Sequence, residues 1–270
     1  MITINDLSFR YRQAARESLQ HISLHVNDGE ALGVIGPSQA GKTTFAFALA
    51  GLLEEHFRGG IMTGSASMNG EEKPPAPSEI GFLFQDASLQ LSGVTDTVEE
   101  EIAFSLEQYG FSRDLMRERI DEQLSVFRLE KLRNRHPKTL SGGETQMVAI
   151  ASEAAKHPRL FILDEPTQAL DAGHIRQVID YLSTAKRASS IIVIEQNLGA
   201  AFEVCNKILF LEKGCQQFFG APVDLLNSDA DLSALALPEI IELQRALKRR
   251  HISLSFKETL PWLKSYRISA

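Results

Sequence analysis

Residues 36–43 restrict the possible folds of this chain more than any other segment. They match G-x-x-x-x-G-K-[ST] as Gly36, Pro37, Ser38, Gln39, Ala40, Gly41, Lys42 and Thr43. An apolar run at 31–35 precedes this phosphate loop and a helix-compatible run follows it from Thr44. In a strand–loop–helix unit of this kind, backbone N–H groups and the helix N-terminus bind phosphate. We expect Lys42 to reach the β and γ phosphates of ATP and Thr43 to bind Mg²⁺. The alternative, a glycine turn before a buried helix, leaves Lys42 without an anion.

An acidic pair follows a second apolar run. Residues 160–163 precede Asp164 and Glu165. Asp164 suits Mg²⁺, and Glu165 suits the positioning of an attacking water, because phosphoryl transfer depends mainly on placement and charge stabilisation. In isolation the segment is equally compatible with a structural strand end. Together with the phosphate loop, it predicts a nucleotide site.

The apolar runs also predict the fold class. Short runs at 31–35, 80–84, 160–163 and 191–194 alternate with helical patterns, which indicates an α/β core with buried parallel strands. Residues 2–11, 18–26 and 64–68 are amphipathic strand candidates, and Asn69-Gly70 predicts a tight turn. An antiparallel β layer is therefore expected beside the core. The 270 residues, 43% hydrophobic and 23% charged, suit one main domain with additions.

Two additions to this core are expected. Residues 86–155 predict an inserted helical subdomain, with Thr97 and Glu100 as a capping box and Ser112 as the cap of a helix over 113–127. The ATP-binding domain is expected over 1–225 and a C-terminal appendage over 226–270. In the appendage, a helix is predicted over 237–250, with Ile240, Leu243 and Leu247 on one apolar stripe. This helix either packs on its own domain or contacts another subunit.

Charge and hydropathy exclude several classes of protein. The net charge of −7 disfavours nucleic acid as a partner. No run approaches the roughly 20 apolar residues of a spanning helix, and the first ten residues do not resemble an export signal. A cytoplasmic location is expected. Cys205 and Cys215 lack the companion residues of a metal site and are interpreted as buried or idle thiols.

A second glycine-rich helix start narrows the interpretation. Leu140, Ser141, Gly142, Gly143 and Glu144 precede a helical run at 145–155. One ATP does not need two such helix starts in one chain, so the segment implies a second subunit, unless it is an accidental serine-capped helix. The segment resembles the LSGGQ signature of ABC-type ATPases and lies, as in that family, between the phosphate loop and the acidic pair. The resemblance implies a P-loop NTPase core of ABC-ATPase type.

The resemblance also implies partners and roles. Two ATPase subunits would hold ATP between the phosphate loop of one and residues 141–144 of the other, and their closure would move an integral membrane partner at the cytoplasmic face. Tyr11 matches the residue that stacks on adenine, Gln85 the glutamine that links Mg²⁺ to the membrane partner, and residues 169–171 a loop that meets the other subunit. The implied sets are nucleotide contacts (Tyr11, residues 36–43, Thr44 and Ser141, Gly142, Gly143 and Glu144), catalytic residues (Lys42, Gln85, Glu165 and Gln196) and metal ligands (Thr43, Gln85 and Asp164).

A subfamily resemblance is carried by two further regions. Residues 85–90 and 97–104 resemble ATPases of energy-coupling factor transporters, which take up vitamins and transition-metal ions. Residues 237–243 resemble the tail of that group, where the tail helps to hold the ATPase pair together. The resemblance favours a subunit contact for this appendage.

The chain departs from the family at several positions. Gln196 stands where the switch histidine is usual, Glu144 replaces the signature glutamine, Met147 replaces an arginine, and Gln39 and Ala40 replace a glycine and a serine. A glutamine amide cannot become cationic, so slower hydrolysis is expected at this chain's own phosphate loop. We therefore expect a heterodimer with a different ATPase subunit. The alternatives are a soluble ABC-type ATPase without a transport role and a regulatory subunit that binds ATP without hydrolysing it.

Overall fold

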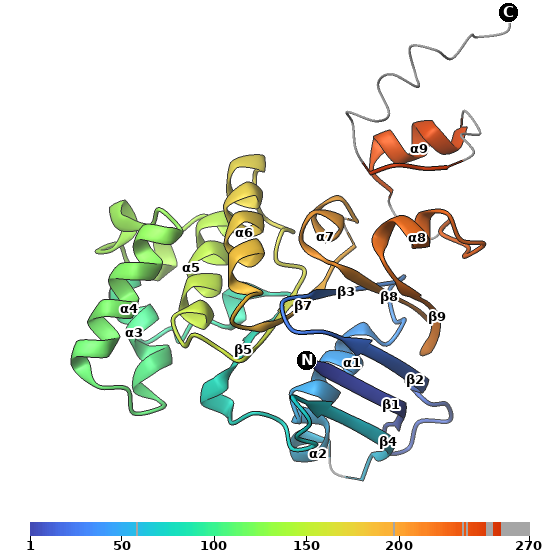
Figure 1. The fold of residues 1–270 in the computed structure, drawn as a ribbon. Helices are drawn as coiled ribbons and strands as arrows, with labels where there is room; N and C mark the ends of the chain where they lie inside the picture. The colour runs from blue at the N-terminus through green and yellow to red at the C-terminus, as the bar shows by residue number, and fades with distance from the viewer. Residues whose placement is uncertain (58, 197, 234, 236, 247–250, 255–270) are drawn as a thin grey trace, which may run out of the picture.

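One sheet runs through the molecule (Figure 1). The structure is a computed structural model that describes residues 1–57, 59–196, 198–233, 235, 237–246 and 251–254. Within these residues, nine strands form the sheet in the order β4-β1-β2-β9-β8-β3-β7-β6-β5. Their bounds are β1 Ile2–Arg10, β2 Leu19–Val26, β3 Ala31–Ile35, β4 Ile61–Met68, β5 Ile80–Leu83, β6 Leu160–Asp164, β7 Ser190–Ile194, β8 Lys207–Glu212 and β9 Cys215–Gly220.

The strands β8, β3, β7, β6 and β5 pair in parallel and form the core. Their side chains are buried on both faces, because helices cover each side. Along β3, Leu32 and Val34 face one apolar cluster, whereas Ala31 and Ile35 face the other. The predicted α/β core is confirmed. The predicted apolar runs match β3, β5, β6 and β7 to within one residue at each end, whereas β8 was not predicted.

The strands β1, β2 and β4 form the predicted antiparallel layer. Asn69 and Gly70 follow β4 with φ of 54° and 82°, the left-handed values of a tight turn that returns the chain to Glu71. Phe45 of α1 is fully buried in the same apolar cluster as Ile4 of β1 and Val34 of β3. Helix α1 is therefore packed between the antiparallel layer and the parallel core.

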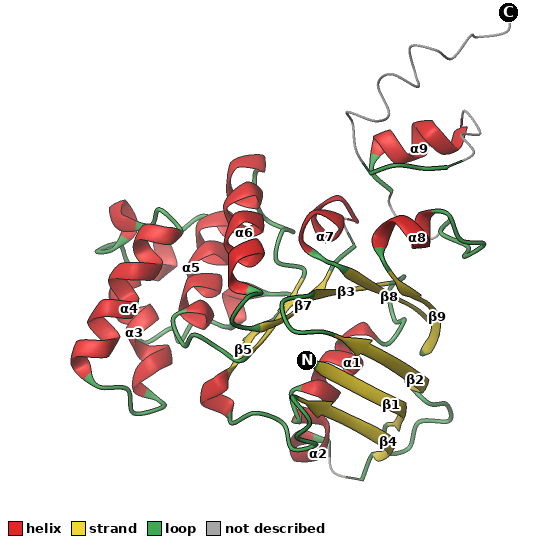
Figure 2. Ribbon diagram, in the orientation of Figure 1, coloured by secondary structure: helices red, strands yellow, loops and turns green. Residues whose placement is uncertain are grey.

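Helices flank the sheet on two sides (Figure 2). Buried side chains of α1 and α2 belong to the cluster shared with the antiparallel layer, and those of α3 to α9 belong to the opposite cluster. The bounds are α1 Lys42–Leu49, α2 Leu52–His56, α3 Val98–Glu107, α4 Arg113–Val126, α5 Gly142–Ala154, α6 Ala172–Ala185, α7 Leu198–Val204, α8 Pro222–Leu226 and α9 Glu239–Ala246.

Helices α3, α4 and α5 lie together on one side of the molecule, at the left of Figure 1. The predicted caps are present. Thr97 and Glu100 form a capping box at the start of α3, and the Ser112 hydroxyl accepts the Leu115 N–H at the start of α4. Local hydrogen bonds thus satisfy the exposed N–H groups at both helix starts.

The C-terminal helix is described over part of its predicted range. Helix α9 runs over Glu239–Ala246, and residues 247–250 with Leu247 lie outside the described residues. Leu243, a member of the predicted apolar stripe, is 41% exposed, whereas Ile241 and Gln244 are buried. The Gln244 amide pairs with both backbone groups of Ser253. Whether the stripe contacts another subunit stays a prediction.

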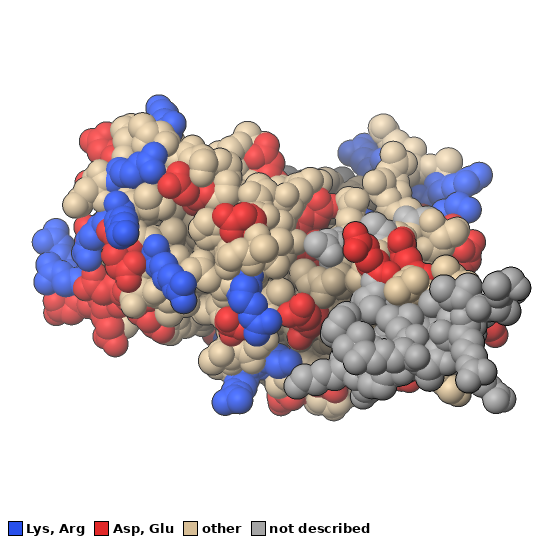
Figure 3. Space-filling model, turned by 90° about the horizontal axis from the view of Figure 1, so that it is seen from above, with Lys and Arg blue, Asp and Glu red and all other residues tan. Residues whose placement is uncertain are grey.

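The surface mixes charges of both signs. On the face shown in Figure 3, Lys and Arg side chains are interspersed with Asp and Glu. Both cysteines are free thiols, and Cys205 is buried. Among the described residues, no helix is both long and apolar enough to span a membrane.

Candidate nucleotide-binding site

The phosphate loop connects β3 to α1 and is closely surrounded by backbone. A Cβ added at Gly36 would lie 2.2 Å from the Leu211 carbonyl oxygen, and one at Gly41 would lie 2.5 Å from the Ser18 carbonyl oxygen. Gly41 also has a φ of 101°. Both positions therefore require glycine. Gln39 has a φ of 63°, in the region that favours glycine, which accounts for the usual glycine at this position.

The Lys42 side chain is held inside the loop. It is 8% exposed, and its Nζ donates to the carbonyl oxygens of Gly36 at 2.8 Å and Pro37 at 2.9 Å. Burial lowers the pKa of Lys42, and the nearby carboxylates of Asp164 and Glu165 oppose this effect. The cation is thus placed beneath the loop, where phosphate oxygens can replace the two carbonyl partners.

A pocket of about 620 Å³ opens over the loop and the first turn of α1. The size and the chemistry of this pocket fit a nucleotide phosphate chain, because N–H groups at a helix start and a buried lysine both favour anions. Ser38 and Gln39 are exposed, whereas Ala40 is buried. The lining residues are Ala14, Ala15, Arg16, Glu17, Ser18, Gln39, Ala40, Gly41, Lys42, Thr43, Thr44, Lys213 and Gly214.

Two of the three predicted Mg²⁺ ligands, Thr43 and Asp164, are in direct contact. Thr43 Oγ1 donates to Asp164 Oδ2 at 3.1 Å. Burial raises the pKa of Asp164 to about 6, so a bound cation would favour its ionised form. No cluster of three or more His, Cys, Asp or Glu side chains suited to a metal occurs in the described part of the chain. A threonine, one carboxylate and water therefore suit Mg²⁺ better than a metal with a full protein shell.

The Glu165 carboxylate lies between two side-chain amides. Gln85 Nε2 donates to Glu165 Oε2 at 3.1 Å, and Gln196 Nε2 donates to Glu165 Oε1 at 2.5 Å. These residues follow β5, β6 and β7, whose carboxyl ends meet at one edge of the sheet. Glu165 itself has a φ of 52° and is fixed by its N–H to the Ile194 carbonyl. The structure thus brings together three of the four predicted catalytic residues, Gln85, Glu165 and Gln196.

Tyr11 lies at the edge of this region. Its hydroxyl and Thr44 Oγ1 are 3.1 Å apart, and its ring makes edge contacts with Phe9 and Phe57 at centroid distances of 4.8 and 5.2 Å. Tyr11 does not line the 620 Å³ pocket. Its stacking on adenine stays a prediction.

The signature segment forms the start of α5. Ser141 Oγ accepts the Glu144 N–H at 3.3 Å, and Glu144 Oε2 accepts the Ser141 N–H at 2.7 Å. This capping box leaves the N–H groups of Gly142 and Gly143 without an acceptor among the described residues. Ser141 and Gly142 are exposed. The two N–H groups and the serine hydroxyl are therefore available to an anion outside the chain.

The loop at 169–171 lies beside the signature. A Cβ at Gly143 would be 3.1 Å from the Ala169 carbonyl oxygen. Asp171 caps α6 by accepting the His174 N–H at 2.9 Å. The signature and this loop therefore form one surface.

Three polar contacts were missed by sequence reasoning. Arg135 donates to Glu144 Oε1 at 3.1 Å, Gln146 donates to the Pro166 carbonyl at 3.2 Å, and the Thr167 hydroxyl donates to buried Glu195 at 2.7 Å. Glu195 follows a fully apolar strand, as Asp164 does, and this pattern was a signal for it. The other contacts join segments with no shared pattern. Met147, which stands where an arginine is usual, is completely buried.

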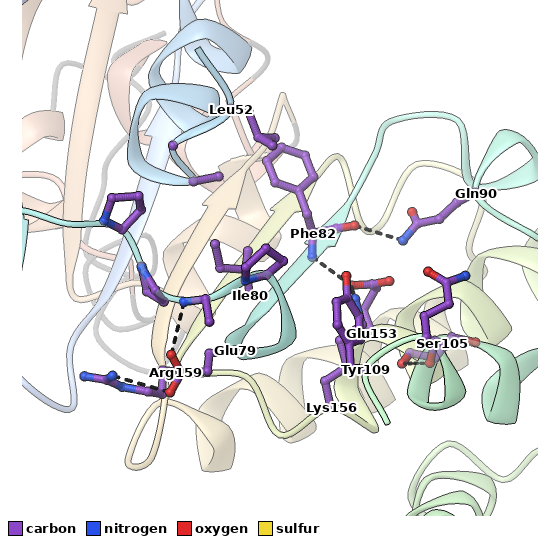
Figure 4. Close-up of a pocket in the computed structure, with 18 of the residues that line it drawn as sticks. Leu52, Glu79, Ile80, Phe82, Gln90, Ser105, Tyr109, Glu153, Lys156 and Arg159 are labelled. Carbon is purple, nitrogen blue, oxygen red and sulfur yellow. Dashed lines mark hydrogen bonds and ion pairs between the residues drawn. The ribbon is translucent and has the colours of Figure 1, made fainter. Parts of the chain in front are cut away.

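A larger groove of about 750 Å³ lies away from the phosphate loop (Figure 4). Apolar side chains of β5 and α3, including Phe82 and Phe104, line it together with the loop at 73–77. Buried Glu153 accepts the Phe82 N–H at 2.9 Å and pairs with Lys156 at 2.7 Å. A second ion pair, Arg159 with Glu79 at 3.4 Å, also lines the groove (Figure 4). The groove thus combines apolar side chains with two ion pairs.

Comparisons with known proteins agree with this geometry. The family model described as ABC transporter matches residues 19–168. A putative ABC transporter ATP-binding protein, PH1815 of Pyrococcus horikoshii, is 34% identical over 258 residues, which are 93% of this chain and 90% of that protein. The energy-coupling factor transporter ATP-binding protein EcfA1 of Bacillus licheniformis is 33% identical over 259 residues, 94% of this chain and 91% of that protein. A Methanosarcina mazei relative is 35% identical, and the matched region spans 97% of this chain but 51% of that protein.

Solved structures share the fold. The structure of cbiO1 from Clostridium perfringens, described as part of the transporter complex cbiONQ, has a TM-score of 0.74 at 20% identity and covers 98% of each chain. A dimeric cassette, MJ0796 bound to ADP and Pi, has a TM-score of 0.69 at 23% identity and covers 82% of this chain and 98% of that one.

Proposed function

This chain belongs to the ABC transporter family of ATP-binding proteins, and we propose that it binds and hydrolyses ATP to drive a membrane transporter. The observation that carries the proposal is the meeting of Lys42, Thr43, Asp164 and Glu165 at one edge of the parallel sheet. The second half of each ATP site would come from the signature of another ATPase subunit.

The described side chains have distinct parts in this hydrolysis. Lys42 and the N–H groups of the phosphate loop hold the β and γ phosphates, and Thr43 with Asp164 and Gln85 would hold Mg²⁺. When bound, Mg²⁺ would supply positive charge that offsets the negative charge of the phosphates. Glu165 orients the attacking water and accepts its proton, after its two amide partners have made room.

In this proposal, Gln196 controls whether the attacking water can reach the Glu165 carboxylate. The carboxylate already accepts hydrogen bonds from Gln85 and Gln196. A neutral amide donor stabilises developing phosphate charge less than a cationic imidazole. Slow turnover at this chain's own site follows.

A different ATPase subunit completes the pair in this proposal. The slow site and the carboxylate in the signature both favour an asymmetric pair, in which the partner supplies the faster site. Purified alone, this chain should turn over ATP slowly and pair weakly with itself. A stable homodimer with brisk turnover would contradict the asymmetric pairing.

The groove of Figure 4 supports a membrane partner. Its apolar wall and volume suit a short amphipathic helix from an integral subunit. The location proposed for the chain is therefore the cytoplasmic face of a membrane. Uptake of a vitamin or a transition-metal ion is supported by the relative named EcfA1 and by the fold shared with cbiO1.

One observation favours a second candidate, a regulatory subunit that binds ATP with little hydrolysis. In that role the amide contacts to Glu165 would persist when ATP is bound. Comparison of Glu165→Gln with the wild-type complex separates the two. A large loss of turnover in the variant supports catalysis, and equally low turnover in both supports the regulatory role.

The main experiment is co-purification from the native membrane with a tag on this chain, followed by partner identification and an ATPase assay. Recovery with a second ATPase and an integral membrane protein supports the transporter. Recovery without any membrane protein would contradict it while leaving the ATP site in place.

A further inference from the structure

We infer that Arg135 is a positioning residue that neutralises the Glu144 carboxylate, so that the start of α5 can accept the γ-phosphate of an ATP bound by a partner subunit. This inference rests on the proposed function, because the anion belongs to a site completed by two subunits.

Glu144 places a negative charge within the first turn of α5. Its Oε2 accepts the Ser141 N–H at 2.7 Å. Hydrogen bonds from Ser141, followed by the charge of and a hydrogen bond from Arg135, lower the pKa of Glu144, so it is ionised at neutral pH. A carboxylate so close to Gly142 and Gly143 repels an incoming phosphate. Without a counter-charge, this repulsion would weaken phosphate binding about threefold to fivefold.

Arg135 supplies this counter-charge from a fixed position. Its NH1 donates to Glu144 Oε1 at 3.1 Å, and its NH2 donates to the Thr139 carbonyl. Its backbone carbonyl accepts the Val98 N–H at 3.0 Å, which ties it to the first turn of α3. The guanidinium is therefore held beside the signature by both its side chain and its backbone.

Glu144 has two opposite effects on the start of α5: it completes the capping box, and its charge repels a phosphate. Glu144 serves the capping box, for which glutamine is equally suitable, since its amide oxygen can accept the Ser141 N–H. Arg135 then compensates only the charge that distinguishes glutamate from glutamine. Substitutions of Arg135 and Glu144 should therefore have opposite effects on KM for ATP, and each should offset the other in the double variant.

The test compares Arg135→Gln, Glu144→Gln and the double variant in the purified transporter complex. Arg135→Gln should raise KM for ATP about threefold to fivefold, the range of a partly exposed charge pair. Glu144→Gln should lower KM, because it leaves the Arg135 cation uncompensated beside the phosphate. The double variant should return to within about twofold of wild type. Arg135→Lys, which keeps the charge, should fall between Arg135→Gln and wild type.

Two controls separate this role from a structural one. Arg128→Gln removes an exposed cation after α4 and should leave KM unchanged. Thermal unfolding of each variant shows whether Arg135 has only a structural role. In that case Arg135→Gln would lower Tm, and the addition of Glu144→Gln would not rescue the variant.

Each result has a clear meaning. Unchanged KM in Arg135→Gln, or no recovery in the double variant, would overturn the inference even if the complex hydrolyses ATP. If the complex shows no ATPase activity that depends on Lys42, the proposed function fails and the inference falls with it. Binding of a fluorescent ATP analogue to the chain alone reports the phosphate loop independently of both.

Discussion

At the scale of single residues, the most consequential contact is the one between Gln196 and Glu165. The sequence shows that a glutamine follows the apolar run at 191–194, and this predicted a weaker donor to phosphate. It could not show that Gln85 and Gln196 both bind the same carboxylate, because that depends on which strand ends lie next to each other. The order β7-β6-β5 places them there.

Replacement of Gln196 by histidine tests this contact. Gln196→His should raise ATP turnover of the complex about tenfold, since a charged donor binds an anion more strongly. The gain should be greatest below about pH 6.5 and should fall as the imidazole loses its proton. Phosphate release measured from pH 6 to 8.5 checks this. Gln196→Ala is the control and should lose activity. An unchanged pH profile in Gln196→His would exclude a role for this position in charge stabilisation.

Asp164 carries a stability cost that follows from its burial. Burial raises its pKa to about 6, above the unfolded value of about 3.9. The folded protein therefore gains stability from the protonated form below about pH 4, and this contribution is lost as pH rises through about 6. At pH 7.5 without Mg²⁺ or nucleotide, Asp164→Asn should raise the free energy of unfolding by about 2 to 3 kcal/mol.

Urea unfolding in the presence of a chelator measures this difference. It should shrink between pH 7.5 and 5 because protonated aspartic acid and asparagine are both neutral. A destabilised Asp164→Asn protein at pH 7.5 would show that the Thr43 hydrogen bond outweighs burial. The same variant should lose Mg²⁺-dependent ATPase activity.

At the scale of helices and strands, the sequence predicted helix caps that depend on neighbouring residues. It did not predict contacts between segments far apart in the chain. The caps at Thr97 and Ser112 depend on residues three positions apart, so the sequence predicted them. The buried face of α9 depends on Ser253, which the chain returns to after the helix.

Two serine caps in the same group of helices provide a matched pair of variants. Ser141→Ala and Ser112→Ala should each lower stability by about 1 kcal/mol, because each removes one N-cap acceptor. Only Ser141→Ala should also weaken ATP-driven pairing of the ATPase subunits, since its hydroxyl is proposed to face the phosphate of a partner. Chemical denaturation and ATP titration of subunit association measure the two effects. Equal loss of pairing in both variants would attribute the effect to helix stability.

At the scale of the whole molecule, the sequence predicted the layers and missed the groove. Parallel strands and an antiparallel layer follow from apolar runs and alternation. The groove is built by the loop at 73–77, β5, α3 and α5, which are far apart in the chain. No periodicity within one segment could indicate it.

Phe104→Glu tests the groove as the contact with the membrane subunit. A carboxylate on its apolar wall should reduce recovery of the integral subunit at least about tenfold, given the cost of burying an unpaired charge. Nucleotide binding by the chain should be retained. Leu243→Glu, on the exposed side of α9, is the control and should keep the partner. Full recovery of the integral subunit with Phe104→Glu would place that contact elsewhere.

The phosphate loop is also closed by a hairpin made late in the chain. The Gly214 N–H donates to the Ala40 carbonyl, and the Gln20 N–H donates to the Gly214 carbonyl. The Leu211 carbonyl lies directly against Gly36. During synthesis, the ribosome therefore releases residues 36–43 long before the segment that fixes their shape. A nascent chain should acquire its affinity for ATP only after Gly214 has left the exit tunnel.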